Sequence, residues 1–81
     1  MNRNHKLAFN ALTKLGVPVY ERCDIENFQI SAEHEDSYKF CNYYSNREDW
    51  IFGVSPVIED TLSKYGLHAE WINAGELGVY N

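Results

Sequence analysis

The chain has 81 residues, of which 44% are hydrophobic and 23% charged, so its composition is that of one globular domain over residues 1–81 and argues against disorder. No apolar run approaches the roughly 20 residues that a membrane span needs, so we expect no membrane association. The formal net charge of −5 disfavours direct binding of nucleic acid, because an acidic surface repels phosphates.

The two cysteines, Cys23 and Cys41, are too few for a disulfide framework and form no CxxC pair. The N-terminal residues MNRNHKLAFNAL include basic side chains but lack the apolar region and cleavage site of a signal peptide. We therefore expect a cytoplasmic protein with two free thiols.

A helix is predicted within the first sixteen residues, in the stretch KLAFNALTKLG. Asn4 is the expected N-cap, Gly16 suits the position after the helix, and Pro18 prevents continuation. The apolar residues recur at the spacing of a single helix face: Leu7, Ala8, Ala11, Leu12 and Leu15. An amphipathic helix of this kind packs one face on a core. The neighbouring His5 is expected to be exposed.

Two strands are predicted next, joined by the turn residues DIEN. Residues 17–23 are β-branched and aromatic, and Pro18 near their start indicates an edge or short strand. Residues 28–34 alternate apolar and polar side chains, as is typical of a strand with one solvated face.

A third strand is predicted for YKFCNYY, residues 38–44, because of its high β-propensity. In that strand Tyr38, Phe40 and Tyr44 share the core face, and Tyr43 points to the other side. A helix is the alternative, since Tyr38, Cys41 and Tyr44 also fit helical spacing.

A second helix is predicted to begin at Ser55 and Pro56, a favourable pair of N-cap and first helical residue, and to end before Gly66. Its apolar stripe is Ile58, Leu62 and Tyr65. The consecutive apolar residues Trp50, Ile51 and Phe52 precede it, and we expect them to be partly buried.

The segment AEWINAGELGVY, residues 69–80, predicts a hairpin of two strands around the turn at residues 73–76. The predicted order is therefore α-β-β-β-α-β-β. Strands in groups with short turns favour an antiparallel sheet, and each helix has one apolar stripe. We predict an α+β two-layer sandwich, in which an antiparallel sheet of four to five strands carries two helices on one face.

Candidates for chemistry are few. His68 and Glu70 lie two residues apart, so both side chains share one strand face. His34 has acidic neighbours, but alternating strand residues point apart, and a solvated hairpin tip explains the cluster. We predict no catalytic residue, metal site or cofactor, and favour a protein that is not an enzyme. A small enzyme or a metal- or ligand-binding domain using His68 and Glu70, or His34, stays open.

The aromatic residues give the clearest functional signal. There are two Trp, six Tyr and four Phe, and half of them fall within residues 38–52. One covered sheet face cannot bury all of them, and surplus Tyr and Trp are typical of protein interfaces. The interaction surface predicted on this basis, with the acidic residues of the first strand connections, is Tyr43, Trp50, Trp71, Tyr80, Glu33, Glu35 and Asp36.

The expected partner is another protein, or a second copy of the chain that covers the open sheet face. An acidic mimic that occupies a nucleic-acid-binding protein is a further alternative, which the charge of −5 permits.

The segments WIFGVSPVIEDTLSKYG and EWINAGELGVYN resemble the C-terminal part of small uncharacterised proteins of T4-like cyanophages. The residues that carry the resemblance are mainly structural: Trp50, Gly53, Pro56, Gly66, Trp71, Gly75, Gly78 and Tyr80. The resemblance implies a phage-encoded accessory protein in the cytoplasm of an infected host cell. It assigns no functional residue.

Overall fold

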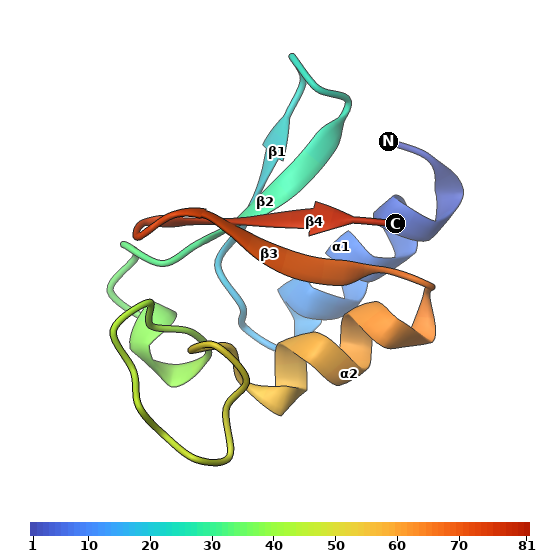
Figure 1. Cartoon of the computed structure of the whole chain (residues 1–81). Coiled ribbons are helices and arrows are strands. Elements are labelled where there is room, and N and C mark those ends of the chain that lie inside the picture. The colour runs from blue at the N-terminus through green and yellow to red at the C-terminus, as the bar shows by residue number, and fades with distance from the viewer.

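Two α-helices and a four-stranded antiparallel sheet form the computed structural model, which describes residues 1–81 (Figure 1). The elements in chain order are α1 (Arg3–Lys14), β1 (Val19–Arg22), β2 (Asn27–Ser31), the 3₁₀ helix η1 (Ser37–Lys39), α2 (Pro56–Lys64), β3 (His68–Asn73) and β4 (Glu76–Tyr80). The strands lie in the order β1–β2–β4–β3. The predicted α+β class with an antiparallel sheet and two helices is therefore confirmed.

The helices begin and end where local sequence signals place them, with one exception. The Ser55 hydroxyl accepts a hydrogen bond from Val57 N–H, so Ser55 caps α2 as predicted. The cap of α1 is Asn2 rather than Asn4: the Asn2 side chain accepts from His5 N–H at 2.9 Å, and the helix starts one residue later. Neither α-helix has the length and apolar character needed to cross a membrane.

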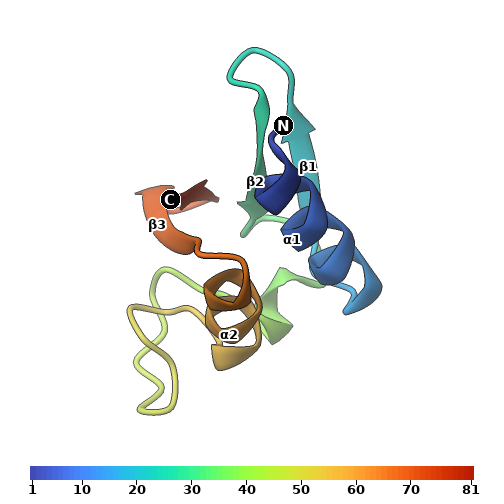
Figure 2. The same ribbon diagram turned by 90° about the vertical axis from the view of Figure 1, so that its right-hand side faces the viewer.

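The core lies between the sheet and the two helices. α1 packs on β1 and β2, while α2 packs on β3 and on α1, an arrangement that Figure 2 shows from the side. Each central strand sends alternate side chains toward the helices. The fully buried apolar side chains of α1, β2, α2 and β4 are Ala8, Leu12, Phe28, Ile30, Ile58, Leu62, Leu77 and Val79.

His5 is buried and links the start of α1 to the sheet, so the expectation that it is exposed is wrong. Its Nδ1 hydrogen-bonds Asn27 Oδ1, and its Nε2 lies 3.0 Å from Asn81 Oδ1. Asn27 in turn donates to the carbonyl of Val79 on β4. The ring thus joins three segments that are distant in sequence.

Replacing His5 by alanine should lower the free energy of unfolding by roughly 2 kcal/mol, because it removes buried packing and the hydrogen bonds that join α1 to Asn27 and Asn81. Urea unfolding followed by tryptophan fluorescence measures the change. Lys6→Ala, on the exposed side of the same helix turn, is the control and should change stability little. Equal stability of both variants would contradict the role given to His5.

Residues 38–44 do not form the strand predicted for them. η1 begins the segment, and only Cys41 pairs with another residue, in an isolated bridge to Val54. The reason lies elsewhere in the chain: β2 pairs with β1 on one side and with β4 on the other, so no free edge remains beside it. Tyr38 and Tyr44, predicted as core residues, are 67% and 80% exposed.

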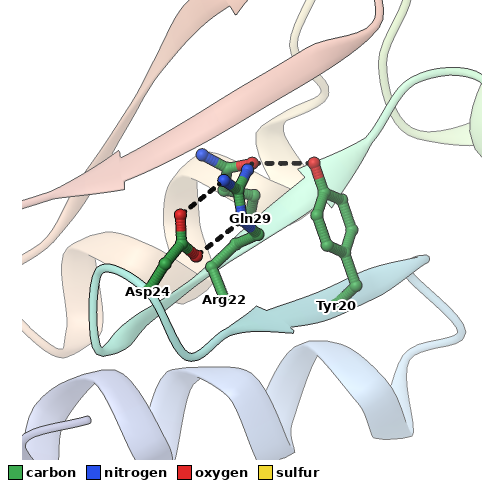
Figure 3. A network of polar contacts seen from close by, with 4 residues as sticks. All are labelled: Tyr20, Arg22, Asp24 and Gln29. Atoms are coloured by element: carbon green, nitrogen blue, oxygen red, sulfur yellow. Dashed lines mark hydrogen bonds and ion pairs between the residues drawn. The ribbon is translucent and has the colours of Figure 1, made fainter.

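The sheet face opposite the helices is polar. Tyr20 Oη and Arg22 Nη1 both donate to Oε1 of the buried Gln29, at 2.7 Å and 3.0 Å, and Arg22 also pairs with Asp24. Figure 3 shows this network on the side of the sheet away from α1. The Asp24 carboxylate has a lowered pKa because it accepts hydrogen bonds from Arg22. This face therefore lacks the extended aromatic surface that the sequence suggested for it.

Both cysteines are free, with Cys23 exposed and Cys41 buried. Burial raises the pKa of the Cys41 thiol to about 11. At pH 8, Ellman's reagent should modify Cys23 quickly and Cys41 roughly 100-fold more slowly, because the thiolate is the reactive form. Counting the modified thiols before and after unfolding in urea tests this, and two thiols of equal reactivity would contradict it.

Candidate functional site

A loop of residues 42–53 leaves the fold and returns to the same point. Asn42 N–H donates to the carbonyl of Gly53 at 2.8 Å, and Ser55 N–H donates to that of Phe40 at 2.8 Å. These bonds flank the isolated bridge between Cys41 and Val54. In Figure 1 it is the yellow-green loop at the lower left. Its base is fixed by backbone hydrogen bonds.

The loop ends in a tight turn at residues 51–54. Ile51 and Val54 exchange two backbone hydrogen bonds, at 3.1 Å and 3.0 Å. The two central residues of the turn, Phe52 and Gly53, have φ angles of 50° and 78°, which are typical of the left-handed pair of a type I′ turn. Asn and Gly are the usual residues at such positions, and a bulky side chain there is an outlier. The Phe52 side chain is nevertheless 87% exposed.

Trp71 holds this turn against strand β3. Its indole Nε1–H donates to the carbonyl of Phe52 at 2.6 Å. Its ring also meets Tyr43 edge to face, with ring centroids 5.4 Å apart, and Tyr43 meets Tyr44 in the same way at 5.2 Å. The exposed Phe52 ring is thus presented from a turn whose position is set by aromatic packing and a hydrogen bond.

An open groove of about 780 Å³ lies between the loop, β3 and the first half of α2. Six of its ten lining residues are hydrophobic, so it is apolar with a few polar groups. The lining residues are Tyr43, Ser45, Ile51, Phe52, Val54, Glu59, His68, Ala69, Glu70 and Trp71.

The charged side chains of the groove are mainly acidic. Burial raises the pKa of Glu59 above its usual value; the nearby His68 opposes this shift and the Asp60 carboxylate adds to it. His68 Nε2 lies 3.2 Å from a carboxylate oxygen of Glu70, so the predicted pair on one strand face does form. No Lys or Arg lines the groove.

The structure brings together two of the predicted aromatic residues and separates the others from them. Tyr43 and Trp71 touch and line the groove. Trp50 lies outside the groove, half-buried beneath the guanidinium of Arg47 at 4.7 Å. Tyr80 lies on the open sheet face, with its ring over Gly78.

The predicted acidic residues lie in the turn that follows β2, and none of them lines the groove. The Glu33 side chain packs on Gly75, while Glu35 is exposed. Asp36 pairs with Lys39 at 3.4 Å and donates its backbone N–H to the ring of His34. The His34 ring therefore accepts a hydrogen bond within a local turn. No group of three or more His, Cys, Asp or Glu side chains is arranged to hold a metal ion.

Sequence reasoning missed Ile51 and Phe52, which it expected to be partly buried; they are 62% and 87% exposed. One signal was present: the glycine that follows them suits the second position of a type I′ turn. The residue type of Phe52 argued against such a turn, so its exposure was not apparent.

Comparisons of the chain with protein-family models, with curated proteins and with solved structures gave no match.

Proposed function

We propose that the protein is a non-enzymatic interaction module that binds another protein through the aromatic groove beside β3. In line with the cyanophage resemblance of its C-terminal half, the proposed setting is that of a phage accessory protein that binds a host or phage protein in the host cytoplasm.

The observation that carries this proposal is the placement of Phe52. A left-handed backbone costs a residue with a side chain about 1–2 kcal/mol. The fold recovers little of this through Phe52, because the ring is 87% exposed. Strained residues that are held by their surroundings cluster at functional sites. Aromatic anchors beside an apolar groove are typical of the few residues that dominate protein–protein binding.

Affinity capture from lysates of infected and uninfected cyanobacteria tests the proposal, with Phe52→Asn compared to the wild type. The matched control is Tyr38→Asn, which removes an exposed aromatic side chain outside the groove. We expect a protein retained by the wild type and by Tyr38→Asn to be lost from Phe52→Asn.

Retention of the same proteins by the wild type and by both variants would contradict the proposal. Light scattering after size exclusion adds a second readout, because a second copy of the chain is one form of the proposed partner. In that form the wild type is a dimer and Phe52→Asn is a monomer.

A further inference from the structure

The groove lies along the edge of strand β3 rather than over one face of the sheet. Four consecutive residues of β3, His68 to Trp71, line it. Successive side chains of a strand point to opposite faces, so a space that touches all four runs beside the strand.

That edge is free to form hydrogen bonds. β3 is the last strand in the order β1–β2–β4–β3, and it pairs only with β4. None of the backbone hydrogen bonds outside the helices and the sheet involves residues 68–73. Every second residue of an edge strand turns its N–H and C=O outward, which is the template for adding a strand.

The opposite edge of the sheet is a poorer template. β1 has four residues and follows Pro18, which has no N–H to donate, whereas β3 has six. No cavity lies beside β1. The combination of an open edge and an apolar groove occurs only at β3.

Charge indicates what kind of strand fits. Glu59 and Glu70 line the groove, and its only basic side chain, His68, is already bonded to Glu70. The Glu59 side chain is half-buried, which raises the pKa of its carboxyl group, so a cation placed beside the carboxylate would be stabilising. A second copy of the chain brings another net charge of −5 to the same place, which disfavours pairing of two β3 edges.

We propose that the groove takes an extended, basic segment of a partner protein, which pairs with β3 as a fifth strand of the sheet. Its side chains alternate between the two faces of the sheet: basic ones face Glu70, and apolar ones contact Tyr43, Phe52 and Trp71 on the side of the helices. Glu59, on α2, adds to the negative charge of the groove. This inference rests on the proposed function and specifies the form and charge of the partner's binding segment.

The probe is a synthetic eight-residue peptide of alternating valine and lysine, capped at both ends, with a valine–glutamate peptide as its control. We expect the basic peptide to bind with a dissociation constant of about 10 µM to 1 mM, and the acidic one to bind about tenfold more weakly or worse. Amide chemical shifts in ¹⁵N spectra should change at residues 43–54 and 68–73.

Two further measurements test the strand geometry and the charge. N-methylation of one alternate set of peptide amides should abolish binding, while methylation of the other set is tolerated. Glu59→Gln and Glu70→Gln should each weaken binding about threefold to fivefold. Glu21→Gln, the same change on the opposite edge strand, should leave it unchanged.

Several results would overturn the inference: no measurable binding, equal binding of the two peptides, shifts confined to β1 or the open sheet face, or indifference to both methylation patterns. None of them bears on the proposed function, which fails only if Phe52→Asn retains every captured protein. The two proposals are therefore tested separately.

Discussion

Replacing Gly53 by alanine is expected to lower the free energy of unfolding by roughly 2–4 kcal/mol, a large part of the stability of so small a domain. Two effects add. A Cβ at this position would lie 2.2 Å from the carbonyl oxygen of Asn42, a backbone atom that cannot move without breaking the loop base. The residue also has a φ of +78°, which disfavours any side chain.

Gly16→Ala is the control for Gly53→Ala. Gly16 has a similar φ of +86°, but a Cβ there meets nothing within 4 Å. This variant should therefore cost only the backbone strain, about 1 kcal/mol. Urea unfolding followed by fluorescence measures both, and Trp71 is a suitable probe because it contacts the loop. Equal losses in the two variants would show that the contact with Asn42 contributes nothing.

Replacing Phe52 by asparagine should raise the free energy of unfolding and weaken the binding of a protein partner. Asparagine tolerates the left-handed conformation far better than phenylalanine, and the exposed ring contributes little packing. We expect the free energy of unfolding to rise by about 1 kcal/mol. We expect binding of a protein partner to fall by roughly 30-fold or more, the loss typical of a dominant aromatic anchor.

The two readouts must be measured on the same preparation, by urea unfolding and by binding of the captured partner. A variant that is more stable and binds less shows that Phe52 is retained for recognition. If Phe52→Asn is instead less stable than the wild type, the ring supports the fold, and the argument from its strained position is wrong. Phe52→Gly repeats the comparison with a residue that has no left-handed strain at all.

Elements with complete local signals were predictable from the sequence. Ser55, Pro56 and Gly66 mark the ends of α2 by capping chemistry alone, which acts within one helix turn. The hairpin of β3 and β4 is equally local, since its strands alternate around a short turn. The α+β class followed from these elements.

The conformation of residues 38–44 was not predictable, because tertiary pairing decides it. A strand after β2 needs a free neighbour, and β4, from the far end of the chain, already occupies that position. Only part of the candidate site could therefore be predicted from the sequence. Tyr43 and Trp71 were recognised as surplus aromatics, but their contact depends on the path of the loop. The exposure of Phe52 depends on a backbone conformation that its residue type disfavours.

The closed base of the loop has a consequence for how such a protein can change. The backbone hydrogen bond between Asn42 and Gly53 fixes the two ends of the loop. The loop therefore leaves and rejoins the rest of the fold at the same two points, whatever segment lies between them. Doubling the length of a flexible loop costs only about 0.6 kcal/mol in closure entropy. Residues 43–52 can thus be exchanged for another segment while the sheet and helices stay constant, and under the proposed function such an exchange would change the partner.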